Sequence, residues 1–381
     1  MKISGGTSLR KSLPKITACI LGAVLITALF LAYARYKINS LLWAPYANEA
    51  AVLLYHQIDP APGGPYSLTL QLFQEHLDAL LQRGYHVIST GELAGFLEGK
   101  TPLPEKAVVI TFDDGYRSFY RYAYPELKAR GFPAANFVIT SWAGKKIGGL
   151  EHLTWNEMRE MQENGMSFYV HTDHSHHRAP TDPEGHPKPV LAHRIWLPGE
   201  NRLETEEEYR QRVVDDLATA RNLMEKKLHR PVTQIAWPYG ESSEPLIEIA
   251  QSLGYQFCYT TRSALVTAKT DPRAIPRLDV GNAGTSAGDL LWQIQSAAFK
   301  EKLLARPGLR FLYNRYHRLK KTWLDSYFSR QFRPPAHQKT AAGYAAGRYP
   351  VFAPPADPVR GAGWGFGDNA GRAGKQILGQ F

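Results

Sequence analysis

The sequence "AVVITFDDGY" (residues 107–116) carries the strongest structural signal in this chain of 381 residues. Six residues typical of a buried strand, 107–112, lead directly into two adjacent carboxylates, Asp113 and Asp114, and then into a glycine. Two carboxylates side by side repel each other, so they need either solvent, as in a turn, or a cation that neutralises them. Taken alone, the pattern favours a solvated turn, and a functional interpretation needs partners from elsewhere in the chain.

Around this stretch, short apolar segments alternate with amphipathic ones from about residue 50 to about residue 282. Strands are predicted at 51–56, 86–90, 107–112, 135–140, 167–171, 234–238, 257–261 and 275–280. Helical patterns lie between them, and two begin with capping boxes, Thr154 with Glu157 and Thr205 with Glu208. This alternation predicts an α/β fold with a parallel sheet, either open or closed into a barrel of seven to eight strands.

Several of the predicted strands end in ionisable or polar residues. His56 follows the first strand, Asp113 and Asp114 follow the third, and His171 follows the strand 167–171. The sequence "PYGE" (238–241) and Asp279 lie at the ends of two later strands. Because parallel strands present their carboxyl ends at one edge of the sheet, we expect these residues to share one rim.

The sequence "HTDHSHHRA" (171–179) places histidines at positions 171, 174, 176 and 177. Imidazoles combined with a carboxylate form a site suited to Zn²⁺, or to Co²⁺ or Ni²⁺. The alternative is a polar surface loop that happens to be rich in histidine. Four histidines in seven residues favour metal binding.

Four motifs together resemble the polysaccharide deacetylase family, also called the NodB-homology or carbohydrate esterase family 4 enzymes. They are "LLYHQI" (53–58), "TFDDGY" (111–116), "HTDHSH" (171–176) and "WPYGE" (237–241). The histidine-bearing strand comes first, and the two motif histidines are five residues apart, which resembles the poly-β-1,6-N-acetylglucosamine N-deacetylase subgroup. The resemblance covers about residues 50–282 and implies a distorted (β/α) barrel of about seven to eight strands.

The resemblance also implies roles for individual residues. Asp114, His171 and His176 would ligate the metal ion, Asp113 would be the general base, and His56 would be the general acid that protonates the departing amine. This division explains why two adjacent acids are tolerated, because one holds a cation while the other handles a proton.

Other assignments stay open at this stage. His174 and His177 are alternatives to His176 as the second histidine ligand. Trp237 and Tyr239 are candidates for lining a sugar-binding groove, with core packing as the alternative for Trp237, and the backbone near Tyr239 is a candidate oxyanion donor. Asp279, with Arg277, either orients Asp113 or His56 or forms a structural salt bridge.

The resemblance implies a metal-dependent N-deacetylase acting on an exported N-acetylglucosamine polysaccharide of the poly-β-1,6 type, with the machinery of exopolysaccharide synthesis or export as a candidate partner. Deacetylation of another glycan, chitin-like or peptidoglycan, is one alternative. A non-catalytic, membrane-anchored glycan-binding protein on the same fold is another.

The N-terminus predicts export from the cytoplasm. Basic residues in the segment 1–15 precede the uncharged run 16–34, which is about long enough to cross a bilayer with its N-terminus inside. Ala32-Tyr33-Ala34 also fits a signal-peptidase site, so the run is either a retained single-pass anchor or a cleaved signal peptide that would release a secreted protein. In both cases the catalytic domain would lie on the periplasmic or extracellular side of the cytoplasmic membrane.

The remaining segments complete the predicted organisation. The deacetylase domain would span 45–285. A basic amphipathic helical extension at 286–330 would follow it, and packing on the domain is favoured over binding to anionic lipid or an acidic partner. The Pro/Gly-rich tail at 331–381 is expected to be disordered or loosely attached. The polar segment 172–203 is either a functional insert or a mobile loop. The net charge of +10 comes largely from the termini and does not indicate nucleic-acid binding. The two cysteines do not form a disulfide framework.

Overall fold

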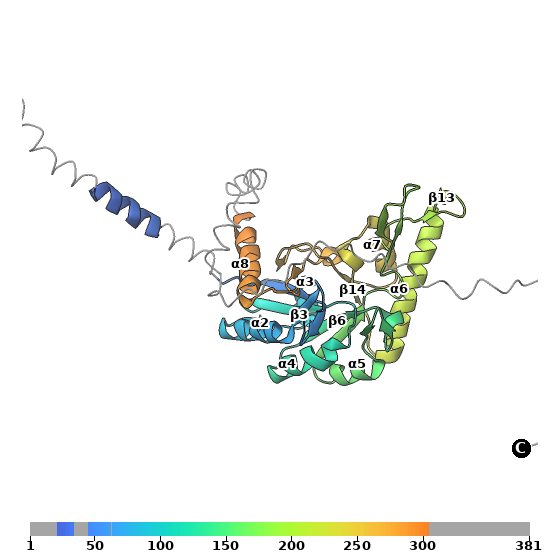
Figure 1. Cartoon of the computed structure of the whole chain (residues 1–381), viewed down its shortest axis with the longest axis horizontal. Coiled ribbons are helices and arrows are strands. Elements are labelled where there is room, and N and C mark those ends of the chain that lie inside the picture. The colour runs from blue at the N-terminus through green and yellow to red at the C-terminus, as the bar shows by residue number, and fades with distance from the viewer. Residues whose placement is uncertain (1–20, 34–44, 62, 305–381) are drawn as a thin grey trace, which may run out of the picture. The chain divides into compact units, whose positions relative to one another are not determined.

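The computed structural model describes residues 21–33, 45–61 and 63–304 (Figure 1). Its central element is a curled sheet in which seven strands follow the order β15-β14-β9-β6-β5-β1-β16. These strands are β1 (Glu49–Tyr55), β5 (Ala107–Phe112), β6 (Ala134–Val138), β9 (Met166–Val170), β14 (Gln234–Ala236), β15 (Phe257–Tyr259) and β16 (Val266–Thr267). Beside this path, β4 (His86–Val87) pairs with β5, and β17 (Leu278–Asp279) pairs with β1. Apart from the antiparallel β16, all pairs in the sheet are parallel.

The predicted parallel α/β architecture is confirmed, and the predicted barrel takes the form of this curled sheet. Its two sides approach each other through the residues around β17, since Ile275 bridges to Tyr259 of β15 while Leu278 pairs with Leu53 of β1. The strands at this closing point are short: β15 spans three residues and β17 spans two. The result is a half-barrel with one continuous order of seven strands.

Strand β5 is central because it is buried on both faces. Val108, Ile110 and Phe112 belong to the apolar core beneath the surrounding helices, whereas Ala107 and Val109 point into a second core inside the curl. The period of two in a strand sends alternate side chains to opposite faces, so one apolar run serves both cores. In-register pairing of Tyr55 with Phe112 brings the carboxyl ends of β1 and β5 to the same level.

The helices surround the sheet, and their starts agree with the capping signals in the sequence. The helices of the domain are α2 (Leu70–Gln82), α3 (Thr90–Leu97), α4 (Tyr124–Ala129), α5 (Trp155–Gln162), α6 (Glu206–Leu228), α7 (Glu244–Ser252) and α8 (Ala287–Leu304). The predicted capping boxes of Thr154 and Thr205 are confirmed at the starts of α5 and α6. The predicted strand 86–90 is wrong beyond Val87, because Ser89 and Glu92 form a third capping box that starts α3.

The polar segment 172–203 folds into two small hairpins, and α6 holds the residues between them. The first pairs β10 (Arg178–Pro180) with β11 (Pro187–Pro189), and the second pairs β12 (Trp196–Leu197) with β13 (Arg202–Leu203). The hydroxyl of Tyr209 donates to the carbonyl of Leu191 over 2.9 Å, and Arg212 donates to the carbonyl of Val190 over 3.1 Å. Of the two interpretations of this segment, the contacts favour an insert with a defined structure.

The remaining pairs of short strands are small two-stranded sheets outside the main one. They join β2 (Gln57–Asp59) to β3 (Ser67–Thr69) and β7 (Lys146–Ile147) to β8 (Leu150–Glu151). The short helical turns are η1 (Phe119–Ala123), η2 (Thr140–Trp142), η3 (Pro238–Gly240) and η4 (Pro272–Ala274).

The segments at the two ends of the domain are described only in part. Helix α8 lies beside α2, and Gln295 donates to the hydroxyl of Tyr85 over 2.7 Å, as expected for an extension packed on the domain. Residues 21–33 are helical. Within the described ranges, the structure contains no helix with the length and hydropathy that crossing a membrane requires. The predicted segments 1–15 and 331–381, and parts of 16–34 and 286–330, lie outside those ranges.

The two neighbouring leucines near the end of α2 test this packing. Leu80 is fully buried in the core, whereas Leu81 is 58% exposed. Replacing Leu80 with alanine should lower the free energy of unfolding by about 2–5 kcal/mol, because it leaves a cavity, while Leu81→Ala should change it by about 0.5 kcal/mol or less. Urea denaturation measures both variants, and equal effects would mean that a different face of α2 meets the sheet.

Candidate active site

Three residues predicted as metal ligands meet at the carboxyl edge of the sheet. Asp114 follows β5, while His171 and His176 follow β9. The Oδ1 atom of Asp114 lies 3.5 Å from Nε2 of His171 and 3.4 Å from Nε2 of His176. One ligand atom from each residue lies within 4.8 Å of the other two. The strand ends therefore assemble a compact Asp-His-His cluster.

The hydrogen bonds of this cluster fit a cation. Nδ1 of His171 lies 2.8 Å from the carbonyl oxygen of Ala236, and because a carbonyl can only accept, Nδ1 carries the proton. In the neutral ring Nε2 is then a lone pair that faces Oδ1 of Asp114, a buried atom with no hydrogen-bond partner in the described structure. Two electron-pair donors facing each other favour a cation between them. Two imidazoles and a carboxylate suit Zn²⁺ or a related transition-metal ion.

The electrostatics keep two residues of this cluster, His176 and Asp114, in forms that can bind a metal ion. Burial lowers the pKa of His176 to about 4, more than the nearby charge of Asp114 raises it, so this imidazole is neutral at neutral pH. Burial would raise the pKa of Asp114, but the imidazoles of His176, His56 and His171 lower it below its ordinary value. A neutral imidazole and an ionised carboxylate are the states that coordinate metal ions.

The other predicted histidines do not join this cluster. His174 points to solvent, and its Nδ1 pairs with Asp173 at 2.5 Å. His177 lies with its Nδ1 3.1 Å from the carbonyl oxygen of His174. Of the three candidates for the second histidine position, His176 is the one that the structure places against Asp114.

Asp113, the other acid of the pair, has a separate partner. Both of its carboxylate oxygens accept from Arg277, each over 2.7 Å, and both side chains are buried. Nε of Arg277 donates to the carbonyl of Thr260 over 3.0 Å, which fixes the guanidinium. Burial would raise the pKa of Asp113, but the charge and hydrogen bonds of Arg277, together with the nearby His171 and His56, outweigh burial and lower that pKa to about 2. Asp113 is therefore ionised although it is buried.

Unlike Arg277, Asp279 forms no salt bridge with a site residue among the described residues. Its register partner is Leu54, two residues before His56, and its Oδ1 atom is buried with no hydrogen-bond partner in the described structure. Arg277 instead forms its salt bridge with Asp113, so of the two residues it is Arg277 that contacts the buried acid. Nδ1 of His56 is also buried without such a partner. His56 lies close enough to help lower the pKa values of both Asp113 and Asp114.

Trp237 and Tyr239 differ in exposure. Trp237 is fully buried, so core packing is the correct alternative for it, and it cannot line a groove. Tyr239 is 39% exposed, and its ring contacts one imidazole and one guanidinium group. Its ring stacks on His176 at 4.9 Å, and the guanidinium of Arg178 lies 4.6 Å from the ring centre. Tyr239 therefore supports the imidazole of His176 at the mouth of the site.

The backbone turns sharply at three strand ends that supply the site. Asp114, Thr172 and Tyr239 have φ values of 71°, 78° and 60°, a left-handed conformation that is uncommon for residues other than glycine. Gly115 continues the first of these turns at φ 74°, and a Cβ atom there would lie 2.9 Å from Cγ1 of Val138. Such strained positions cluster where function holds them in place.

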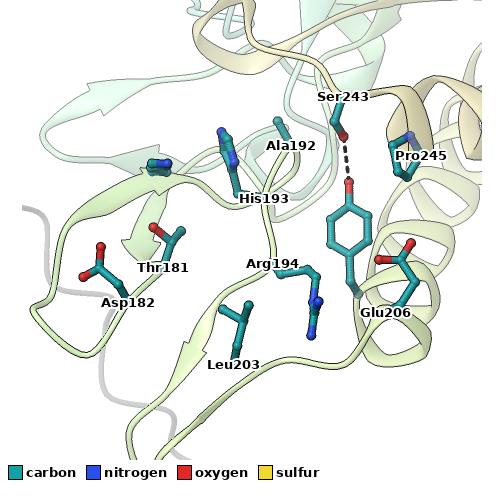
Figure 2. A pocket seen from close by; sticks show the side chains of 11 residues that line it. Thr181, Asp182, Ala192, His193, Arg194, Leu203, Glu206, Ser243 and Pro245 are labelled. Atoms are coloured by element: carbon teal, nitrogen blue, oxygen red, sulfur yellow. Dashed lines mark hydrogen bonds between the residues drawn. The ribbon is translucent and has the colours of Figure 1, made fainter.

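A separate cavity of about 380 Å³ lies between the insert and the first turns of α6 and α7 (Figure 2). Its lining includes Asp182, His193 and Arg194 from the insert, and the hydroxyl of Tyr209 lies 3.3 Å from Oγ of Ser243. None of the predicted site residues lines it. His193 connects it to the site region through Glu241, which its Nε2 contacts at 3.1 Å.

The pair of Arg277 and Asp113 makes a testable contribution to stability. Replacing Arg277 with methionine leaves a buried carboxylate without its counter-charge, and we expect the free energy of unfolding to fall by about 3–5 kcal/mol. Arg273→Met is the matched control, because Arg273 contacts Asp271 at the surface and exposed pairs contribute little. Urea denaturation distinguishes the two, and a small loss for Arg277→Met would show that the buried pair is not formed.

The chain is similar to known proteins over much of the described domain. A family model described as polysaccharide deacetylase matches residues 100–258. A poly-β-1,6-N-acetyl-D-glucosamine N-deacetylase of Escherichia coli K12 is 32% identical over 228 residues, which cover 57% of this chain and 34% of that protein. This chain thus spans about a third of the length of that relative.

Two further matches cover most of the protein compared. A Bacillus subtilis protein named as a polysaccharide deacetylase, YxkH, is 30% identical over 240 residues, which cover 62% of this chain and 74% of that protein. The structure of a de-N-acetylase from Aggregatibacter actinomycetemcomitans superposes with a TM-score of 0.56 at 28% identity, covering 60% of this chain and 94% of the other. The chain belongs to the polysaccharide deacetylase family, hydrolases that act on the amide bonds of acetylated polysaccharides.

Proposed function

We propose that this chain is a divalent-metal-dependent N-deacetylase of an exported N-acetylglucosamine polysaccharide, with a poly-β-1,6-linked polymer as the preferred substrate. The observation that carries the proposal is the separation of the two adjacent acids. Asp114 faces two imidazoles, while Asp113, beside it, is held ionised by Arg277. An amide hydrolase needs both a cation site and a separate proton acceptor at one place.

In this proposal Asp114, His171 and His176 hold the metal ion. When bound, a divalent cation supplies Lewis acidity to a water molecule and to the amide carbonyl. Asp113 accepts the proton of the attacking water, because its carboxylate is ionised well below neutral pH. His56 donates a proton to the departing nitrogen, and the backbone N–H of Tyr239 stabilises the oxyanion.

The substrate assignment rests on the names of the relatives and on the order of the motifs. The Escherichia coli relative is named for the poly-β-1,6 polymer. Another acetylated glycan, chitin-like or peptidoglycan, would use the same chemistry. A non-catalytic glycan-binding protein is disfavoured because Asp113, Asp114, His56, His171 and His176 are all present.

We also infer that the enzyme works outside the cytoplasmic membrane, because the run 16–34 has the composition of an anchor or a signal peptide. At that location it would meet a polymer that is leaving the cell. The machinery that makes or exports the polymer is the partner that this location favours.

Metal dependence and linkage preference are tested in one assay. The purified protein is stripped with a chelator and supplied again with Zn²⁺, Co²⁺ or Ni²⁺, and acetate release is measured from β-1,6- and β-1,4-linked N-acetylglucosamine oligomers. We expect no release without metal and faster release from the β-1,6 oligomer with it. Release from the β-1,4 oligomer alone would keep the chemistry but reject the substrate, and release that a chelator leaves unchanged would reject the metal.

The two acids should respond differently to the same substitution. Asp113→Asn removes the proton acceptor, so turnover should fall by at least about 10²-fold while zinc binding persists. Asp114→Asn removes a ligand, so zinc binding and turnover should both be lost. Isothermal titration with Zn²⁺ and the acetate assay separate the two outcomes. Loss of zinc binding in Asp113→Asn alone would show that the roles are reversed.

A further inference from the structure

The two histidines of the cluster are joined by four residues that form no helix or strand. His171 directly follows β9. It is fixed there, because its backbone N–H donates to the carbonyl of Val138 over 2.9 Å and its Nδ1 contacts the carbonyl oxygen of Ala236. His176 has no such strand support, since residues 172–177 are irregular. The position of the second imidazole therefore depends on the connecting residues, 172–175, which we call the ligand loop, as well as on the contact of its ring with Tyr239.

One carboxylate holds most of this loop. Asp216, on α6, accepts three hydrogen bonds from three consecutive residues of the ligand loop. Oδ1 accepts from the backbone N–H of Asp173 over 3.0 Å, and Oδ2 accepts from the backbone N–H of His174 over 2.8 Å. Oδ2 also accepts from Oγ of Ser175 over 2.8 Å. Hydrogen bonds to an ionised carboxylate are about twice as strong as neutral ones.

The loop is fixed from its other side by η2. The hydroxyl of Thr140 donates to Oδ1 of Asp173 over 2.5 Å, and the backbone N–H of Thr140 donates to the carbonyl of Thr172 over 3.1 Å. Thr172 is buried and has the left-handed φ of 78°. A backbone in this conformation reverts to a commoner one unless its surroundings fix it. Asp216 and η2 together supply that restraint.

Asp216 itself is not a member of the cluster of Asp114, His171 and His176. It faces the back of the loop, and its three contacts end at Ser175, directly before His176. We propose that Asp216 is a positioning residue that presents His176 to the cation and thereby sets the metal affinity of the site. This inference rests on the proposed function in one respect, that the cluster binds a divalent cation.

The helix that carries Asp216 offers a matched control. Asp215 immediately precedes Asp216 and is exposed, and its carboxylate accepts from Gln211 on the same helix over 2.8 Å, whereas the hydrogen bonds of the ligand loop to this part of α6 go to Asp216. Asp215→Asn and Asp216→Asn remove the same charge from adjacent positions of α6. Any difference between them therefore reports the contacts to the ligand loop and not the net charge of the protein.

The first measurement is the affinity of the full-length protein for Zn²⁺, by competition with a chelator of known affinity. Loss of a residue that orients a metal ligand typically weakens metal binding 10- to 100-fold. We expect Asp216→Ala and Asp216→Asn to lose affinity by about that factor, since the amide of asparagine would place N–H groups against N–H donors. Asp215→Asn should bind as the unchanged protein does. Equal affinities in all of these proteins would overturn the proposal.

A second measurement needs no metal. Hydrogen exchange of the metal-free protein should show faster exchange at the amides of Asp173 and His174 in Asp216→Ala, while the amide of His171, bonded to β6, stays protected. Unchanged exchange at residues 173 and 174 would reject Asp216 as the anchor of the loop.

A fourth variant, on the loop side, keeps the test decisive if Asp216→Ala fails to fold. Ser175→Ala removes one of the three donors from the loop side and leaves α6 intact. It should keep the melting temperature and lose zinc affinity by a smaller factor than the Asp216 variants. A folded Ser175→Ala protein with unaltered zinc affinity would count against the proposal. If the unchanged protein binds no Zn²⁺ or Co²⁺, the proposed metal site is rejected. The exchange measurement still tests separately whether Asp216 holds the ligand loop.

Discussion

The site depends on one electrostatic constraint, the repulsion between two neighbouring carboxylates at the end of a fully buried strand. The left-handed turn at Asp114 sends the two acids to different partners. Asp113 turns to a buried guanidinium held by Thr260, while Asp114 turns to two imidazoles. Strand β17 pairs with β1, and β1 pairs with β5, so Arg277, the residue before β17, lies where it can reach the end of β5. A sheet that did not curl would leave Asp113 buried without a counter-charge.

The sequence predicted the parts of this arrangement that are local. Apolar runs bounded by polar residues located every strand of the main sheet except β16, which is two residues long, and capping boxes located the starts of α5 and α6. The histidine cluster, the paired acids and the family resemblance together pointed to Asp114, His171 and His176, which the structure brings together because residues that end parallel strands meet at one edge. The strand predicted at 86–90 was too long because the Ser89–Glu92 capping box was not recognised.

Contacts between residues far apart in the chain were less accessible. From the sequence, Arg277 was considered only together with Asp279, its neighbour two residues away. Its actual partner, Asp113, lies 164 positions away, and no local pattern predicts that contact. Trp237 lies in a motif next to the exposed Tyr239, and an apolar pattern does not reveal which of the two reaches solvent. Asp216 carries no motif. Its spacing from Tyr209 and Arg212, seven and four residues, does place all three on one face of α6, and this periodicity was the available signal.

That face of α6 has a consequence for how the insert can change. Tyr209 holds Leu191, Arg212 holds Val190 and Glu204, and Asp216 holds the ligand loop. Successive turns of the helix therefore hold different parts of the segment that connects β9 to α6. Apart from those of Asp216, the hydrogen bonds from α6 to the insert among the described residues go to Val190, Leu191, His193 and Arg202, and none of these four lies at a hairpin tip. The unit that could be transplanted between related enzymes is accordingly the insert together with the first three turns of α6, and a graft that ended at the start of the helix would leave the second histidine without its scaffold.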